Sequence, residues 1–178
     1  MPFILLDRDG VINHDSVEYI KSPEEWLPID GSLEAIARFN QAGYQVIVAT
    51  NQSGLARGLY DLPTLTKIHQ KFFTLLAEAG GKVEEIFFCP HHPNNHCSCR
   101  KPEPGMLHNI AKKYPIDLTT TIFIGDSLSD VQAAERAGCE PVLVLTGNGK
   151  RTLEELPAPT KVRYFNDLAH AATIICKK

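Results

Sequence analysis

The amino-acid sequence predicts an α/β protein of three layers, in which helices cover both faces of a mainly parallel, Rossmann-like sheet. Three observations lead to this prediction. Short apolar runs recur along the 178 residues, segments with helical periodicity separate them, and 43% of the residues are hydrophobic, enough for a sizeable core. We find neither an internal repeat nor a linker in the sequence, so we expect a single domain over residues 1–178.

The strands of this sheet are expected where apolar residues follow one another without interruption. These runs cover residues 3–6, 44–49, 83–88, 121–124, 142–145 and 162–165. Strands that are apolar along their whole length are typical of parallel sheets buried on both faces. The runs therefore predict both the strand positions and a sheet enclosed between two layers.

The helices are expected between these runs, where apolar residues recur at spacings of three and four. A further helix is expected to carry Val131 and Ala134, with Ser127 or Ser129 as its N-terminal cap. The clearest apolar stripes are Leu33, Ile36 and Ala37; Leu65, Ile68, Phe72, Leu75 and Leu76; and Leu107, Ile110, Ala111 and Tyr114.

Two segments, 13–30 and 89–104, do not follow the alternation of strand and helix. Each begins where a strand is expected to end. Ligands of open α/β sheets bind outside the carboxyl ends of the strands. Both segments are therefore expected to border the functional site.

Composition and charge exclude several classes of protein. Eighteen Lys and Arg against 21 Asp and Glu give a formal net charge of −3, which lacks the basic excess of a dedicated nucleic-acid-binding protein. The apolar runs are far shorter than the roughly 20 residues of a membrane span, and the N-terminus does not resemble a secretory signal. These features disfavour nucleic acid and membranes as partners. Separately from them, we expect a cytoplasmic protein, most simply a monomer, with a small-molecule partner.

Two carboxylates directly follow the first expected strand, in the tetrapeptide Asp7-Arg8-Asp9-Gly10. Residues i and i+2 of an extended chain point the same way, so Asp7 and Asp9 can face one pocket. Carboxylates so close repel each other unless a proton or a cation intervenes, and Mg²⁺ is the cation that suits oxygen ligands best. An ordinary Asp-Gly turn is the competing interpretation, which the preceding apolar strand makes less favoured.

Polar residues also follow other expected strands. Thr50, at the end of the second run, can bind phosphate oxygens through its hydroxyl, although the sequence after it would also suit a plain polar loop. Asp126 follows the run 121–124 and could complete a metal site, or simply belong to a helix cap. Arg100 and Lys101 are an ordinary surface pair unless the fold returns Lys101 to the end of the first strand.

Three of the five cysteines lie within eleven residues, in Cys89-Pro90-His91 and Cys97-Ser98-Cys99. Three thiolates and an imidazole suit a tetrahedral, structural Zn²⁺ site, and the odd cysteine count argues against a disulfide framework. The spacing of one intervening residue is weak evidence by itself. His92 and His96 are alternative nitrogen ligands, and an incidental cysteine-rich loop is the competing interpretation.

The order of Asp-x-Asp, Thr-Asn, Lys and Gly-Asp along the chain resembles the haloacid dehalogenase (HAD) superfamily of phosphatases. The stretches 7–13, 50–58 and 99–107 resemble its histidinol-phosphatase-like subfamily, which includes heptose bisphosphate phosphatases. The resemblance covers nearly the whole chain. It implies a HAD fold without a large cap domain, and a zinc loop over about 89–99 in which His91 is the nitrogen ligand.

The resemblance also implies a mechanism. Asp7 would attack phosphorus to form an aspartyl-phosphate, and Asp9 would act as general acid and then as general base. Thr50 and Lys101 would hold the phosphoryl oxygens. Mg²⁺ would be bound by Asp7, Asp126 and the backbone carbonyl of Asp9. The residues expected to bind the rest of the substrate are Asp15, Asn51, Gln52, Ser53 and Arg100, the last through the second anionic group.

The substrate that the resemblance implies is D-glycero-D-manno-heptose 1,7-bisphosphate, losing its 7-phosphate in nucleotide-activated heptose and lipopolysaccharide synthesis, with the β anomer favoured. Histidinol phosphate is the alternative substrate, and the acidic charge disfavours a polynucleotide 3′-phosphatase. A non-catalytic zinc-binding module would leave the carboxylates unexplained. Some relatives carry Lys where this chain has Ser127, so a contact made by that Lys is not expected here.

Overall fold

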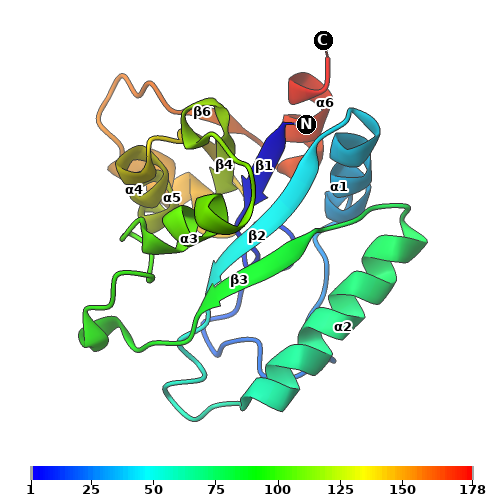
Figure 1. Cartoon of the computed structure of the whole chain (residues 1–178), viewed down its shortest axis with the longest axis vertical. Helices are drawn as coiled ribbons and strands as arrows, with labels where there is room; N and C mark the ends of the chain where they lie inside the picture. The colour runs from blue at the N-terminus through cyan, green and yellow to red at the C-terminus, as the bar shows by residue number, and fades with distance from the viewer. Residues whose placement is uncertain (1, 178) are drawn as a thin grey trace.

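The computed structural model describes residues 2–177, and their strands form one sheet in which all neighbouring strands are parallel (Figure 1). The six strands in this part of the chain are β1 (Phe3–Leu6), β2 (Gln45–Asn51), β3 (Glu85–Cys89), β4 (Ile122–Gly125), β5 (Glu140–Val144) and β6 (Arg163–Phe165). Their order across the sheet is β3-β2-β1-β4-β5-β6. The prediction of a parallel sheet is confirmed, and each predicted apolar run overlaps one strand.

Strand β5 begins at Glu140, two residues before the apolar run that predicted it. Glu140 and Pro141 pair with Ile122 and Phe123 of β4. Pairing in a sheet depends on backbone hydrogen bonds, and proline is tolerated near the start of a strand. The hydrophobic pattern therefore located this strand but not its first residue.

The helices connect the strands and cover the sheet. In the described part of the chain they are α1 (Ser32–Gln41), α2 (Leu62–Glu78), α3 (Gly105–Lys113), α4 (Leu128–Ala137), α5 (Gly149–Glu155) and α6 (Leu168–Ile175), with short 3₁₀ helices η1 (Pro93–Asn95) and η2 (Leu118–Thr120). The predicted stripes fall on α1, α2 and α3 and supply buried residues of each, except that Tyr114 lies just after the last residue of α3.

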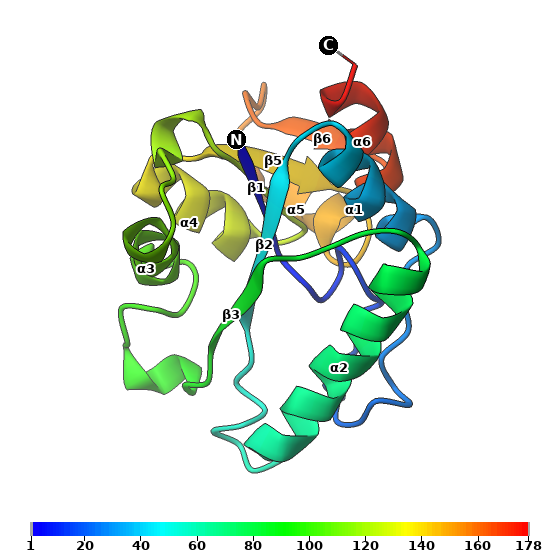
Figure 2. The ribbon, with the colours of Figure 1, turned by 45° about the vertical axis from the view of Figure 1, so that its right-hand side comes forward.

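Alternate residues of the central strand β1 face opposite helical layers. Ile4 and Leu6 pack in a core with α1, α2 and α6, whereas Phe3 and Leu5 pack in a second core with α3 and α4. Figure 2 shows these two groups of helices on opposite sides of the sheet. This arrangement is the predicted three-layer architecture.

Helix α4 begins with a capping box that also shapes the site. The Ser127 hydroxyl accepts a hydrogen bond from the Asp130 amide, and the Asp130 carboxylate accepts one from the Ser127 amide. Of the two serines considered as caps, Ser127 is therefore the one that caps the helix. The same box holds the Asp130 side chain at the carboxyl end of β4.

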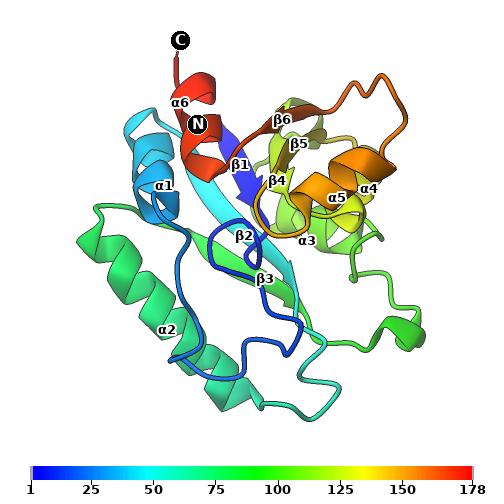
Figure 3. The same ribbon diagram turned by 180° about the vertical axis from the view of Figure 1, so that it is seen from behind.

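The site lies where the chain reverses its direction of progress across the sheet. From β1 the chain adds β2 and β3 on one side, and it then returns to place β4 on the other side of β1. The segment 13–30 and the connection from β2 to α2 both leave from this end of the sheet (Figure 3). Such a switch point is where open α/β sheets bind their ligands. Within residues 2–177, none of the helices combines the length and apolar character needed to span a bilayer.

Candidate active site

Lys101 lies at the centre of a group of carboxylates at the carboxyl ends of β1 and β4. Its Nζ lies 2.9 Å from Asp7 Oδ1 and 2.6 Å from Asp130 Oδ1, and it donates a hydrogen bond of 2.8 Å to the Ala49 carbonyl. The side chain is only 2% exposed. The irregular segment after β3 thus returns Lys101 to the end of the first strand, which was the condition for it to be more than a surface residue.

The carboxylates of Asp7, Asp126 and Asp130 bring more negative charge than Lys101 balances. Burial raises the pKa of Asp7 well above its usual value, the charge of Asp130 adds to this, and Lys101 partly offsets it. Burial and Asp130 likewise raise the pKa of Asp126 to about 7. One oxygen from each of the three carboxylates lies within 4.8 Å of the others. A buried oxygen cluster with excess negative charge is suited to a hard divalent cation.

Lys101 itself stays charged in this environment. Burial alone would lower the pKa of its ammonium, but the carboxylates of Asp130 and Asp7 more than compensate, so the pKa lies above its usual value. Asp130 is held for this pairing by its other oxygen, Oδ2, which accepts hydrogen bonds from the Ser127 hydroxyl and from the backbone amides of Ser127 and Asp126. Asp130 therefore positions the ammonium group of Lys101.

Asp126 is oriented by Asn148, which follows β5. The backbone amide of Asn148 donates to Asp126 Oδ2 at 2.7 Å, and its side-chain amide donates to the same oxygen at 3.2 Å. Gly10 and Gly147 pass so close that a Cβ on either would come within 2.2 Å of that oxygen, and both have positive φ. Glycine is required at both positions because of this close approach.

A cavity of about 350 Å³ opens over these groups and joins most of the predicted site residues. It is lined by Asp7, Asp9, Asp15, Thr50, Asn51, Gln52, Ser53, Arg100, Lys101 and Asp126, together with Ser16, Val17, Tyr19, Ile20, Tyr60, Ser127, Ser129 and Asn148. Both irregular segments border it, as expected. The segment 13–30 contributes Asp15 and the very exposed Val17, and the segment 89–104 contributes Arg100 and Lys101.

Asn51 and Gln52 were predicted to bind substrate, but their side-chain amides form hydrogen bonds with other groups of the protein. The side chain of Asn51 donates to the Lys101 carbonyl at 3.0 Å and accepts from the Lys101 amide at 3.1 Å. Gln52 is only 3% exposed, and its amide contacts Asp9 and Thr50. Asn51, the last residue of β2, thereby holds the backbone of Lys101 at the cavity, a role that the sequence did not indicate.

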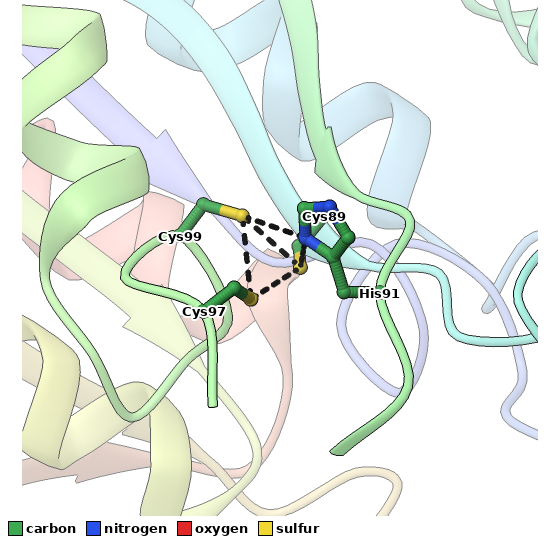
Figure 4. Close-up of side chains that lie close together, drawn as sticks. All are labelled: Cys89, His91, Cys97 and Cys99. Carbon is green, nitrogen blue, oxygen red and sulfur yellow. Dashed lines mark hydrogen bonds between the residues drawn. The ribbon is translucent and has the colours of Figure 1, made fainter. Parts of the chain in front are cut away.

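The cysteine-rich segment brings four metal-binding side chains together beside the site (Figure 4). The sulfur atoms of Cys89, Cys97 and Cys99 lie 3.3 to 3.6 Å apart, and His91 Nδ1 lies 3.3 Å from Cys99 Sγ and 3.5 Å from Cys89 Sγ. A tetrahedron with Zn–S bonds of about 2.3 Å has edges of roughly 3.8 Å. The four atoms lie somewhat closer together than that, near enough for one ion to contact all of them.

The geometry also distinguishes the three histidines considered as ligands. His91 lies in the cluster, whereas His92 caps η1 by accepting a hydrogen bond from the Asn94 amide. The metal-binding group found within residues 2–177 does not include His96. The fourth ligand atom of this group therefore comes from His91.

The chain is similar to known phosphatases along nearly its whole length. A family model described as HAD-hydrolase-like matches residues 98–171. A D-glycero-β-D-manno-heptose-1,7-bisphosphate 7-phosphatase from Bordetella bronchiseptica is 54% identical over 97% of this chain and 96% of its own length. The enzyme of the same name from Pseudomonas aeruginosa is 53% identical with the same coverage. The chain belongs to this family of HAD-like phosphatases.

Solved structures of family members agree with the fold. A D,D-heptose 1,7-bisphosphate phosphatase from B. bronchiseptica, crystallised with magnesium and phosphate, matches with a TM-score of 0.95 and 53% identity over 98% of both chains. A Burkholderia thailandensis phosphatase of the same description matches with a TM-score of 0.80 and 43% identity over the full length of both chains. The fold predicted from the resemblance, with helices on both faces of a parallel sheet, is that of the family.

Sequence reasoning missed several residues that complete the site. Asp130 lies four residues after Asp126 at the start of a helix, a spacing that could have indicated a shared location. Asn148 follows the end of β5 and could have been found by the same strand-end rule that selected Asp7. Tyr60 comes from the connection before α2, and the sequence carries no signal that it reaches the cavity.

Proposed function

We propose that the chain is a Mg²⁺-dependent phosphatase that removes the 7-phosphate of D-glycero-β-D-manno-heptose 1,7-bisphosphate. The observation that carries the proposal is the buried group of Asp7, Lys101 and Asp126 in one cavity with Asp9. The substrate is supported by the relatives, which bear that name at 53–54% identity over nearly the whole chain.

The reaction divides into two steps at phosphorus. A carboxylate oxygen of Asp7 forms a bond to phosphorus while the bond to the sugar oxygen breaks, and protonated Asp9 gives its proton to that oxygen. Asp9, now ionised, takes a proton from a water molecule, whose oxygen attacks the aspartyl-phosphate. The Asp7–phosphorus bond breaks, inorganic phosphate leaves, and both carboxylates return to their starting states.

Lys101 and Thr50 hold the phosphoryl group while charge moves over its oxygens. Both side chains are buried at the bottom of the cavity, where the low effective dielectric strengthens their interaction with an anion. Asp7 and Asp126, with the backbone carbonyl of Asp9, would hold Mg²⁺, which when bound would neutralise the repulsion between carboxylate and phosphate. The excess negative charge of the cluster fits such an ion.

Zinc fits the second cluster and would have a structural role. Cys89, His91, Cys97 and Cys99 would fill its four coordination positions and leave none open for catalysis. The site would fix the loop that ends in Arg100 and Lys101. Cys139 and Cys176 lie outside this group and are small, partly or fully buried side chains.

Arg100 is the side chain that would recognise the second phosphate of the substrate. It lines the cavity beside Lys101, and its Nη1 is buried without a hydrogen-bond partner among residues 2–177. A guanidinium suits a phosphate because it can donate two parallel hydrogen bonds. Asp15 and Ser53 line the same cavity and would contact the sugar.

We also infer that the chain acts as one domain and as a cytoplasmic monomer. One sheet with both layers of helices carries every proposed catalytic residue, which supports a single domain. Clustered reduced cysteines are typical of a reducing compartment. Gel filtration with light scattering tests the monomer, which a dimeric mass would contradict.

The substrate is tested by measuring phosphate release with Mg²⁺ from the α and β anomers of heptose 1,7-bisphosphate, fructose 1,6-bisphosphate and histidinol phosphate. The β anomer should give the highest kcat/KM. Histidinol phosphate as the best substrate would replace the proposal by the histidine-pathway alternative. Absence of Mg²⁺-dependent turnover with every ester would contradict a phosphatase altogether.

A further inference from the structure

The amide of Gln52 connects the two parts of the catalytic site. Its Nε2 donates one hydrogen bond of 2.9 Å to Asp9 Oδ2 and one of 3.0 Å to Thr50 Oγ1. A primary amide has two N–H groups, so both are used. Gln52 therefore contacts the proposed general acid and the proposed phosphate-binding hydroxyl at the same time.

The remaining polar atom of Gln52, Oε1, accepts a hydrogen bond of 2.6 Å from the Tyr60 hydroxyl. Tyr60 is 8% exposed, and burial raises the pKa of its phenol to about 12, so the phenol remains a donor at any physiological pH. Gly54 leaves the room for this ring, because a Cβ there would come within 2.2 Å of Tyr60 Cε1.

We infer that Tyr60 is a positioning residue for catalysis, which acts through Gln52 to orient Asp9 and Thr50. A donor at Oε1 selects the amide orientation in which the N–H groups face Asp9 and Thr50. The reverse orientation would place the amide oxygen against the Asp9 carboxylate, where two acceptors repel each other. Gln52 is thereby assigned to the protein's own framework rather than to substrate binding.

The orientation has a consequence at each end of the amide. At Asp9, the bond from Gln52 adds to those from Arg8 and Asn13, so the carboxylate is fixed on both oxygens. At Thr50, a lone pair of the hydroxyl oxygen is occupied by Gln52, which leaves the hydroxyl hydrogen to donate to a phosphoryl oxygen. Proton transfer depends on such placement within hydrogen-bond reach.

This role rests on the proposed function of Asp9, and it predicts a dependence on the leaving group. An alkoxide such as that of a sugar needs protonation as it departs, whereas 4-nitrophenolate leaves without it. A displaced Asp9 should therefore slow sugar phosphates more than 4-nitrophenyl phosphate. A purely structural loss of folded enzyme would lower both rates by the same factor.

The test compares kcat/KM of Tyr60→Phe with that of the unchanged protein on heptose 1,7-bisphosphate and on 4-nitrophenyl phosphate. The variant keeps the ring and removes only the hydroxyl, so we expect a loss of about three- to tenfold on the sugar phosphate, and a clearly smaller one on the aryl ester. The matched control is Tyr164→Phe, on β6, where the side chain is 50% exposed. It should lower neither rate.

A second variant, Gln52→Met, keeps the length of the side chain and removes the amide. It should give a larger loss on the sugar phosphate, about ten- to a hundredfold, again exceeding the loss on the aryl ester. Equal losses on both substrates in either variant, or unchanged rates in Tyr60→Phe, would overturn the inference. If instead the unchanged protein hydrolysed neither ester with Mg²⁺, that result would contradict the proposed function itself.

Discussion

At the scale of single residues, the proposed chemistry depends on the charges that surround Asp7, since burial and the charge of Asp130 raise its pKa and Lys101 offsets only part of that rise. Burial opposes ionisation of this carboxyl, and its ion pair with Lys101 favours it. Asp130 holds Lys101 from the other side at 2.6 Å. The proposed nucleophile is thus part of a buried charge network, so replacement of any member changes the electrostatic environment of the others.

Substitution of Asp7 or Asp9 should lower phosphate release, whereas substitution of an exposed aspartate should not. Asp7→Asn should abolish phosphate release, because an amide does not attack phosphorus as a carboxylate does. Asp9→Asn should lower kcat by about 10²–10⁴, the usual contribution of a general acid and base. Exposed Asp30→Asn is the control, with circular dichroism to verify folding. Near-normal turnover of Asp7→Asn would exclude the aspartyl-phosphate mechanism, and near-normal turnover of Asp9→Asn would exclude its role as general acid and base.

Arg100→Ala should affect bisphosphate substrates more than monophosphates. A charged, bidentate contact contributes roughly 1.5–3 kcal/mol, so kcat/KM for heptose 1,7-bisphosphate should decline about ten- to a hundredfold. An aryl monophosphate should lose little, since Lys101 still holds the transferring group. Arg151→Ala, at a side chain that is 80% exposed, serves as the control. Equal losses on both substrates would show that Arg100 supports the loop instead.

At the scale of elements, the segment 89–104 matters most, because it carries Lys101 without being a helix or strand for most of its length. Its start is fixed by β3, which ends at Cys89, and its far end contacts α4 through hydrogen bonds from Arg136 to Pro102 and Glu103. Between these points the cysteine cluster brings the two ends of the loop 89–99 together. A bound metal would therefore stabilise this loop, which lacks the regular hydrogen bonds of a helix or strand.

The cluster should hold one zinc ion per chain, measurable by elemental analysis of protein made under reducing, metal-replete conditions. Cys97→Ser should lower the zinc content and, with it, the activity, because the loop that presents Lys101 loses its support. Cys176→Ser, at a cysteine outside the cluster, should retain the metal. Acid should release zinc as the thiolates become protonated. Protein without zinc but with full activity would contradict the structural role.

At the scale of the whole molecule, a buried polar contact joins α2 to the end of β1. Arg8 is fully buried between the Asp9 carboxylate and His69, with Nη1 at 3.1 Å from His69 Nε2. Burial, helped by the charge of Arg8, lowers the pKa of His69 to about 3, although Asp9 opposes this. The histidine is therefore neutral in the folded protein at neutral pH and accepts a hydrogen bond from the guanidinium.

This histidine should make the folded state sensitive to acid. Between about pH 6.5 and pH 3 the unfolded chain binds a proton at His69 and the folded chain does not. The contribution of His69 to the free energy of unfolding is therefore fully present above pH 6.5 and is lost as the pH falls towards 3, by up to about 1.4 kcal/mol per pH unit. Urea unfolding across this range should show a flatter pH dependence for His69→Gln than for the unchanged protein. Exposed His108→Gln should not change the slope, and a slope unaltered in His69→Gln would contradict the account.

The sequence by itself determined the layers of the fold and the location of the proposed nucleophile. Uninterrupted apolar runs can only be buried on both sides, which requires helices on both faces of a parallel sheet, and the alternation within β1 places Ile4 and Leu5 in different cores. The strand-end position of Asp7 and Asp9 followed from the same local pattern. The close spacing of the cysteines and His91 likewise made a metal cluster predictable, because few residues separate its members.

Only the tertiary structure decided which distant side chains meet at that strand end. Asn148 reaches Asp126, Asp130 pairs with Lys101, and Tyr60 contacts Gln52, each through packing between different elements. Hydrophobic periodicity predicts which face of a helix or strand is buried. It does not predict which polar side chains from other elements lie next to that face. The residues that bind to substrate could therefore be proposed from strand ends, whereas those that hold them in place became visible only when the sheet brought its carboxyl ends together.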